Sequence, residues 1–535
     1  MTESNATHKL NAGAEAADGG AIAEMLHVAA PAVGTMLSYT VMQFVDLLIV
    51  SHIGGDAIAA VGNAGVAAFL PAAAMFGVVG VINTFVSQNL GAGTPERGSS
   101  YAWNGLWLTV AVWAVVLIPF ALCFAQVQAL MRSVMGLEIA DSIAHMEVQY
   151  GRILVFGMVL TIAARGLSHF FYGVHRPWMV MVAAVVGNAV NVPLTWALVT
   201  GAWGAPELGV AGAAIGTVIG SGVEFALLFA MFLSPGFNSA FKTRSAWRVS
   251  GKAMGDIWRI GWPAGLMFGN EILCWWVFMS GLIAHFGVVH NTAGFIVLRY
   301  MHVSFMPAVG LSMAVTAVVG KYIGRGRHDL AAKRIRLGLG IGLVYMGTCA
   351  LAMNVFREPA IRLFATWLPI EDTSGADGFS VDELVSLGSG LLILAAAFQL
   401  FDALAIILTG ALRGAGDTLF PGIVTVILSW VLIVGLGAVL KEQAPGLGSY
   451  GPWIGAASYI IVLSVVMLGR YWSGAWRRID LLGAAASDVA RGVRQPPLAV
   501  DAGEGVVPEL PAIDLPTAVV AGDDGGGFEQ GPSGP

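Results

Sequence analysis

Twelve long apolar stretches dominate this chain of 535 residues, and they constrain its fold more than any other feature. An α-helix needs about 20 consecutive apolar residues to cross the ~30 Å hydrocarbon core of a bilayer. The stretches are long enough for that, and most lack the strict alternation of a β-barrel strand. They cover approximately residues 22–51, 57–89, 99–125, 147–172, 177–200, 209–233, 258–286, 291–320, 333–356, 384–412, 417–440 and 451–473. The sequence therefore predicts an all-α polytopic membrane protein with twelve transmembrane helices.

The composition favours a membrane protein and excludes a soluble one. Only 11% of the residues are charged and 57% are hydrophobic, with a mean hydropathy of +0.76, whereas soluble domains carry about 25% charged residues. Cys123, Cys274 and Cys349 fall within apolar stretches, so we expect packing residues and not a disulfide framework. The first twenty residues lack the basic start of a signal peptide, so the first span is expected to be retained.

Positive charges are distributed unevenly between the two sides of the predicted bundle. When the N-terminus is placed in the cytoplasm, twenty of the 27 Lys and Arg residues fall on the inner side and five on the outer side. Cytoplasmic loops of membrane proteins carry such an excess of positive charge. We therefore expect a multi-pass protein of the plasma (inner) membrane with both termini in the cytoplasm, which requires an even number of spans.

The chain contains an internal repeat. Pro31 opens the first stretch, 62 residues before Gly93 at the end of the second. Pro263 opens the seventh stretch, 63 residues before Gly326 at the end of the eighth. Two six-helix lobes in the same orientation follow, a transporter plan in which the substrate site lies between the lobes. The predicted organisation is a disordered N-terminal tail (1–20), an N-lobe (21–233), a cytoplasmic linker (234–257), a C-lobe (258–475) and a largely disordered cytoplasmic tail (476–535).

Three carboxylates lie within apolar stretches: Asp46, Glu271 and Asp402. A charge at the bilayer centre costs at least ~2.5–3.5 kcal/mol, so such residues usually face a wet interior and carry function. Spacing along the helices places Glu271 and Asp402 near the midplane of the same lobe, where they could share one Na⁺ site. Asp46 lies nearer the outer end of the first span, and we interpret it as a separate proton site. All three are predicted to couple transport to Na⁺ or H⁺.

Two further charged residues lie at similar depth in the N-lobe. Arg165 and Glu224 are expected to form a structural ion pair. Arg299 is the other arginine that we expect to be buried. A buried charge needs such a partner, so the pair is interpreted as part of helix packing.

Polar residues of the fifth span recur at helical spacing. They are Asn188, Asn191 and Thr195, beside Pro193. Polar side chains in a proline-containing membrane helix often satisfy the backbone groups that the proline frees. A role in a polar cavity of the N-lobe explains them equally well, and the sequence leaves both interpretations open.

A set of methionine and tryptophan side chains on the first and seventh spans suits promiscuous binding of apolar cations. We interpret them as possible contacts with substrate, although helix packing is the commoner role of such residues. The set is Met36, Met42, Met267, Trp275 and Met279.

Motifs of several enzyme classes are absent from the sequence. There is no G-x-x-x-x-G-K-[ST] loop, no cysteine/histidine cluster of a structural metal, and no G-x-S-x-G or H-E-x-x-H signature. We therefore expect no enzymatic activity, no ATP-driven engine, and no cofactor besides a coupling Na⁺ or H⁺.

The sequence resembles the multidrug and toxic compound extrusion (MATE) transporters of the NorM-like branch over about residues 22–475. Pro31 precedes Asp46 by fifteen residues, and Pro263 precedes Glu271 by eight. Three motifs add to the resemblance: VSQNLGAG (86–93), NVPLTWALVTGAWGAPELGVAGAA (191–214) and QLFDALAIILTGALRGAGDT (399–418). The resemblance implies two six-helix lobes around a V-shaped cavity. It also implies export of organic cations or other toxic compounds in exchange for Na⁺ or H⁺.

By the same resemblance, Asp46 matches the family's acid in span one, and Glu271 and Asp402 match the acids of spans seven and ten. Thr195 departs from the branch, which tends to have a second asparagine there. Phe398 stands where a tyrosine is common, which removes one oxygen atom from the expected Na⁺ site.

The sequence fits other functions less well. A flippase for a lipid-linked saccharide or another amphiphile needs more cationic residues in the cavity than Arg165 and Arg299. A major-facilitator porter carries an acid and several basic residues after span two, where this chain reads GAGTPERGSS. A membrane-embedded enzyme or receptor would gather reactive groups at one depth. The expected partners are small-molecule organic cations or drugs and the lipid bilayer; we expect a monomer and no nucleic acid.

Overall fold

The computed structural model describes residues 3–135, 140–366 and 380–483. Within these residues, twelve apolar helical spans are long enough to cross a membrane, which confirms the predicted all-α fold and the number of spans. The first six spans comprise α1 (Glu3–Ser51), α2 (Gly55–Gly80), α3 (Ile82–Gly91), α4 (Pro95–Val112), α5 (Ile118–Leu122), α7 (Asp141–Gly173), α8 (Pro177–Thr200) and α9 (Val210–Phe232). The last six comprise α11 (Gly251–Val277), α12 (Val288–Gly324), α13 (His328–Val355), α15 (Val381–Gly414), α16 (Leu419–Leu428), α17 (Gly437–Gln443) and α18 (Tyr450–Trp472).

Several local features were not predicted, because hydrophobicity does not distinguish them from a plain helix. Short helices follow the third, sixth and ninth spans: α6 (Phe124–Met135), α10 (Pro235–Phe241) and α14 (Arg357–Ala365). Three spans contain a π-helical stretch, at Trp113–Leu117, Phe278–Ile283 and Ser429–Leu436. Such stretches are frequent at functional sites.

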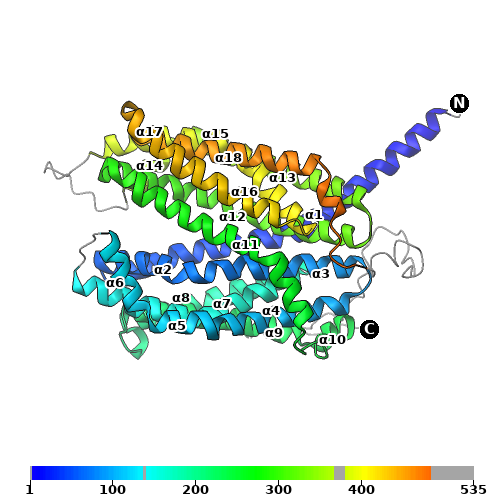
Figure 1. Ribbon diagram of the computed structural model, residues 1–535, viewed down its shortest axis with the longest axis horizontal. Coiled ribbons are helices and arrows are strands. Elements are labelled where there is room, and N and C mark those ends of the chain that lie inside the picture. Colours follow the sequence, from blue (N-terminus) through cyan, green and yellow to red (C-terminus); the bar gives the residue numbers. More distant parts are fainter. Residues whose placement is uncertain (1–2, 136–139, 367–379, 484–535) are drawn as a thin grey trace, which may run out of the picture. The chain divides into compact units, whose positions relative to one another are not determined.

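The first helix is longer than the sequence analysis predicts. We expected a disordered tail at residues 1–20, but α1 begins at Glu3 and continues without a break into the first span (Figure 1). This segment is rich in alanine and contains no proline, so it favours a helix. The acidic C-terminal tail predicted after residue 475 lies mostly outside the described residues, which end at residue 483.

The helices form two groups that follow the order of the chain. In the first half, α2 packs against α7, and α8 packs against α9; in the second half, α15 packs against α12, α13 and α18. Figure 1 shows most of the blue and cyan helices on one side and most of the green to orange helices on the other, with the green α10 beside the first group. Because α1 also packs against α12, and α11 against α2, these helices form the boundary between the halves together with α3.

Glycines allow the two halves to approach closely at one place. A Cβ atom on Gly91 of α3 would lie 2.0 Å from the carbonyl oxygen of Lys321 on α12. One on Gly324 would lie 2.0 Å from the carbonyl oxygen of Gln88. Small residues permit this kind of backbone contact between membrane helices. Any larger residue at either position requires the halves to move apart.

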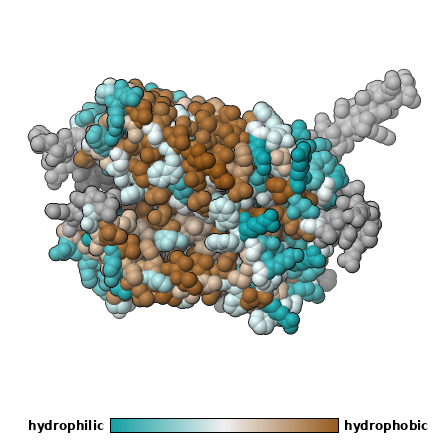
Figure 2. Space-filling model, viewed as in Figure 1, coloured by the Kyte–Doolittle hydropathy of each residue, from teal (hydrophilic) through white to brown (hydrophobic). Residues whose placement is uncertain are grey.

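Hydrophobic side chains cover the middle of the face shown in Figure 2, and hydrophilic residues gather at its two ends. This distribution is typical of a protein whose middle faces acyl chains and whose ends face head groups and water. Together with the twelve apolar spans, it shows a multi-pass membrane protein.

Candidate functional site

The second half brings Glu271 and Asp402 together. Glu271 on α11 and Asp402 on α15 lie close enough for their charges to interact. Tyr459 on α18 is buried beside both carboxylates, and Thr425 on α16 lies beside the Tyr459 hydroxyl. Oxygen-bearing side chains from four helices thus lie in the same region of the second half. Tyr459 and Thr425 could not be predicted from the sequence, because an isolated tyrosine or threonine in an apolar span carries no signal.

A hydrogen-bond network next to this site holds α11 against the π-helical stretch that follows α16. The Asn270 amide donates to Ser429 Oγ at 2.8 Å and accepts from Trp430 Nε1 at 2.7 Å. Cys274 Sγ lies 3.6 Å from the backbone oxygen of Ser429. Because Asn270 directly precedes Glu271, the network fixes the part of α11 that carries the carboxylate.

Asp46 belongs to the first half. Its neighbours are Tyr150 on α7 and Thr217 on α9, neither of which the sequence analysis selected. Its Oδ1 atom is buried and has no hydrogen-bond partner among the described residues. A buried carboxylate oxygen without a donor is costly, so this site is suited to take up a proton or a cation.

Arg165 and Glu224 do not form the direct ion pair that the sequence predicts. None of the ion pairs within the described part of the chain joins them. The Tyr39 ring centre lies 3.9 Å from the guanidinium carbon of Arg165, and the Tyr39 hydroxyl donates a hydrogen bond to Glu224. A cation–π contact and a charge-assisted hydrogen bond thus replace the ion pair.

The predicted polar residues of α8 connect it to two helices of the first half. Asn188 donates to the side-chain and backbone oxygens of Ser38 on α1, at 2.8 and 3.1 Å. Asn191 and Thr195 are buried, and Thr195 Oγ1 donates to Asn191 Oδ1 at 3.3 Å. Thr195 also packs closely against Gly216 of α9. These contacts tie α8 to its neighbours, while a role in a polar cavity stays a prediction.

The methionine and tryptophan side chains fall into two groups. Met36 and Met279 are 4% and 3% exposed, so they pack within the protein in this conformation. Met42, Met267 and Trp275 are partly exposed and present surface that a ligand can contact. The predicted contact with substrate therefore stays open for the second group.

Two arginines bear on the prediction of buried cations. Arg299 was expected to be buried, but it is exposed on α12. Arg413 at the end of α15, for which the sequence gives no prediction, lines a small cavity with Met267 and Thr409. Its Nε atom is buried and has no partner within the described residues. Phe398, where the resemblance led us to expect a lost ligand, lies in the hydrophobic core of the second half.

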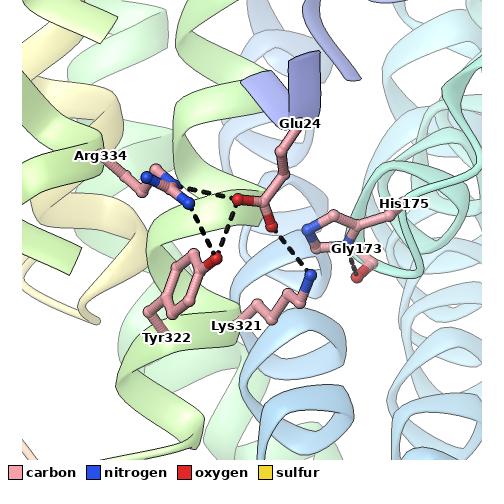
Figure 3. A network of polar contacts seen from close by, with 6 residues as sticks. All are labelled: Glu24, Gly173, His175, Lys321, Tyr322 and Arg334. Carbon is pink, nitrogen blue, oxygen red and sulfur yellow. Dashed lines mark hydrogen bonds and ion pairs between the residues drawn. The ribbon is translucent and has the colours of Figure 1, made fainter. Parts of the chain in front are cut away.

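A polar cluster around Glu24 joins the two halves (Figure 3). Glu24 on α1 forms ion pairs with Lys321 on α12 and with Arg334 on α13, both at 2.9 Å. The Tyr322 hydroxyl donates to Glu24 Oε2 at 2.8 Å and accepts from Arg334 at 3.2 Å. The charged side chains are 14–20% exposed, so water screens these ion pairs only in part.

His175, in the loop between α7 and α8, lies beside this cluster (Figure 3). Burial lowers the pKa of His175 to about 3, and the positive charge of Lys321 acts in the same direction. Its Nδ1 atom lies 3.2 Å from the carbonyl oxygen of Gly173, while its buried Nε2 atom has no partner among the residues described. The imidazole is therefore neutral at physiological pH.

Side chains of α3 add hydrogen bonds across the same boundary. Asn83, Thr84 and Gln88 donate to backbone carbonyls of α12 and α15 at 3.1, 2.8 and 2.9 Å. We call this region the closed end; it comprises the Glu24 cluster, these α3 contacts and the close approach at Gly91. Across residues 3–135, 140–366 and 380–483, the hydrogen bonds between the two halves are those of α3, those of Glu24 and one from the Tyr101 hydroxyl of α4 to Asp256 of α11.

Comparison with known proteins agrees with the resemblance seen in the sequence. The family model described as MatE matches residues 31–197 and 266–439, which is more than half of the chain. Two relatives are each named "Probable multidrug resistance protein NorM". The one from Pseudomonas syringae pv. tomato is 26% identical over 87% of this chain and 97% of its own length. The one from Deinococcus radiodurans is 29% identical over 84% and 94%.

A solved structure shows the same fold. "Crystal structure of MATE in complex with MaL6" matches with a TM-score of 0.76 at 19% identity, over 86% of this chain and 98% of that one. The family match covers most of both halves, and the relatives are matched over nearly their whole length. This chain therefore belongs to the MatE family.

Proposed function

We propose that this protein is a secondary active antiporter that exports small organic cations and drugs in exchange for H⁺ or Na⁺. Its relatives are named multidrug resistance proteins. The observation that carries the proposal is the pair of Glu271 and Asp402, which lie together and form no ion pair with a basic residue in the described part of the chain. Two carboxylates in apolar spans need a proton or another cation to balance their charge.

In this proposal the second half binds the coupling ion. The oxygen atoms of Glu271, Asp402, Tyr459 and Thr425 form a donor set that suits a hard cation. The same carboxylates accept protons when no metal cation is bound. Asp46, beside Tyr150, provides a second proton site in the first half.

Export further requires that the closed end opens. The halves then separate at the Glu24 cluster. The partly exposed residues Met42, Met267 and Trp275 then contact substrate from one side of the membrane at a time. Ion binding drives this exchange only if the two states differ in their affinity for the ion. The distribution of Lys and Arg supports a cytoplasmic location of the closed end and of both termini, in the plasma membrane. We propose a monomer as the working unit.

Ethidium efflux from proteoliposomes tests the proposal, with an imposed Na⁺ gradient in one series and an imposed pH gradient in another. At least one gradient is expected to drive efflux by the wild-type protein. Asp402→Asn and Glu271→Gln are expected to abolish the response, and Asp46→Asn to abolish the response to pH. Asp56→Asn, which removes an exposed acid at the start of α2, is the matched control and should retain activity. An efflux rate that depends on neither gradient would rule out antiport.

One observation favours a second candidate, a flippase for a lipid-linked saccharide or another amphiphile. Arg413 adds a partly buried cation whose backbone contacts Thr84 of the first half and whose Nε atom has no partner among the described residues. Phosphate groups are recognised by such guanidinium groups. Translocation of a fluorescent lipid-linked saccharide in the same proteoliposomes would distinguish the two functions, because an antiporter for organic cations leaves it in its original leaflet.

A further inference from the structure

An aromatic groove lies where the segment between the halves meets the first half. It has a volume of about 580 Å³ and is lined by Trp103 and Trp107 of α4, Leu233 after α9, and Arg244 and Trp247 of the linker. The short helix α10 packs against both α4 and α9, and Figure 1 shows the three helices beside one another. The groove has no role in the transport mechanism proposed above.

Hydrogen bonds satisfy the polar atoms of two of the indoles. Trp103 Nε1 donates to the carbonyl of Thr243 at 2.8 Å, and Trp107 Nε1 donates to the carbonyl of Trp247 at 2.9 Å. The two indoles stack with 6.3 Å between ring centres and an interplanar angle of 23°. Because their N–H groups are used within the protein, the rings offer apolar surface to the groove.

Arg244 combines a fixed position with unused donors. Its Nε atom donates to the carbonyl of Leu233 at 2.8 Å, and its backbone N–H donates to Asn238 Oδ1 at 3.0 Å. Within residues 3–135, 140–366 and 380–483, its terminal N–H groups have no acceptor and it forms no ion pair. A guanidinium group matches the geometry of a phosphate. The rim of the groove therefore carries the positive charge of Arg244, which forms no ion pair within the described residues and can bind a phosphate.

The groove lies where a membrane span ends. The apolar helix α9 ends at Phe232, directly before Leu233 of the groove. Trp247 is 55% exposed, and tryptophan is enriched at the boundary between hydrocarbon and head groups. Lys242 and Arg248 are exposed in the same short segment, so the local potential is positive.

We propose that this groove binds one anionic glycerophospholipid of the surrounding leaflet. The lipid phosphate accepts hydrogen bonds from Arg244, and one acyl chain lies across the three indoles. A lipid is the occupant that matches both the apolar wall and the charged rim, and the bilayer supplies it directly beside the groove. Bound in this way, the lipid connects α4 and the end of α9 with the linker and stabilises the link between the two halves.

Native mass spectrometry of the full chain tests this proposal with phosphatidylglycerol and phosphatidylcholine of identical acyl chains. Phosphatidylglycerol is expected to bind more tightly. Arg244→Gln is expected to weaken its binding about fivefold, which corresponds to the ~1 kcal/mol of one basic residue at an anionic surface. Arg336→Gln removes an exposed cation of α13 outside the groove and is expected to leave binding unchanged. Equal binding of the two lipids, or equal effects of the two variants, would overturn the proposal.

Soluble glycerol phosphate separates a lipid site from a plain phosphate site. It is expected to displace phosphatidylglycerol only at far higher concentration, and Trp247→Ala is expected to weaken binding of the lipid but not of glycerol phosphate. If glycerol phosphate competes at a concentration similar to that of the lipid, the groove is a phosphate site and the assignment to a lipid is wrong.

Photo-crosslinking of the wild-type protein needs no variant and therefore no assumption about folding. Phosphatidylglycerol with a diazirine in its acyl chain is expected to label peptides that contain residues 103–107 and 244–247. Labelling spread evenly over the hydrophobic surface would show that the groove has no preference for this lipid.

Discussion

Glu24 Oε1 on α1 lies 2.9 Å from Lys321 Nζ on α12, so an ion pair crosses the boundary between the two halves of the chain. The same carboxylate pairs with Arg334 on α13, also at 2.9 Å. One acid from the first half therefore pairs with two cations from the second. Because the Glu24 side chain is only 19% exposed, loss of its charge leaves both cations poorly compensated.

We predict that Glu24→Gln destabilises the closed end by about 1–3 kcal/mol. This free energy is smaller than that of a fully buried ion pair, because the Glu24 side chain is partly exposed. Opening can be measured as the rate at which the cysteine of Ser87→Cys is alkylated, in a protein whose native cysteines have been replaced. Ser87 is buried at the boundary, so the reagent reaches this position only when the halves separate. The rate should rise about fivefold or more. Asp329→Asn breaks an exposed pair with Arg327 and should leave the rate unchanged. An unaltered rate in Glu24→Gln would show that the ion pairs do not hold this end closed.

A second prediction concerns the close approach of α3 and α12. Gly91→Ala places a methyl group 2.0 Å from the backbone oxygen of Lys321, which cannot yield without movement of a helix. The substitution should lower the melting temperature in detergent and increase alkylation at Ser87. Gly340→Ala on α13 meets no atom within 4 Å and should be neutral or slightly stabilising. If the two variants behave alike, the contact at Gly91 does not join the halves.

His175 makes stability depend on pH. Burial, together with the positive charges of Lys321 and Arg325, lowers the pKa of His175 to about 3, while Glu24 acts in the opposite direction. In the unfolded chain a histidine has a pKa of about 6.5. The unfolded state therefore binds a proton first as the pH falls. The stabilisation is fully present above about pH 6.5 and is lost between there and pH 3, by up to ~1.4 kcal/mol per pH unit.

His175→Asn tests this titration. Asparagine tolerates the positive φ of 59° at this position and retains an amide donor for the carbonyl of Gly173. Between pH 7 and pH 5, the wild-type melting temperature should fall more than that of the variant. Identical pH dependence of the two proteins would show that another group dominates the loss of stability.

Tyr459 is predicted to contribute an oxygen to the ion site of the second half. Tyr459→Phe keeps the ring but removes the hydroxyl beside Glu271 and Asp402. The ion concentration for half-maximal efflux should rise about fivefold to tenfold, as expected for the loss of ~1–1.4 kcal/mol. Tyr450→Phe removes a hydroxyl from the first residue of the same helix, 3.5 Å from the carbonyl of Leu387, and serves as the control. Equal ion dependence in both variants would exclude Tyr459 from the site.

Tyr39 is predicted to stabilise the first half by connecting Arg165 with Glu224. Tyr39→Phe retains the ring against Arg165 but leaves the carboxylate without its donor, and should destabilise the fold by about 1–3 kcal/mol. Tyr39→Leu also removes the cation–π contact and should lower the melting temperature further. If Tyr39→Phe melts at the wild-type temperature, the hydroxyl contributes nothing and the ring alone matters.

The number and type of the spans could be predicted because hydrophobicity and helix length are local properties of the chain. The same holds for the three acids, since the cost of burying a charge marks Asp46, Glu271 and Asp402 without knowledge of their neighbours. The helical start of α1 differs from the prediction, because the polar composition of residues 1–20 favours disorder while its alanines favour a helix. The π-helical stretches were missed because they share the composition of the surrounding helix.

The sequence alone determines the twelve spans, the repeat of two six-helix halves and the presence of three acids in apolar surroundings. The partners of those acids depend on the packing of segments far apart in the chain, and on the rotation of each helix about its axis. One residue along a helix turns a side chain by about 100°, so spacing cannot place Tyr459 beside Glu271 or Tyr39 between Arg165 and Glu224. The contact of Glu24 with Lys321 depends equally on how the halves meet.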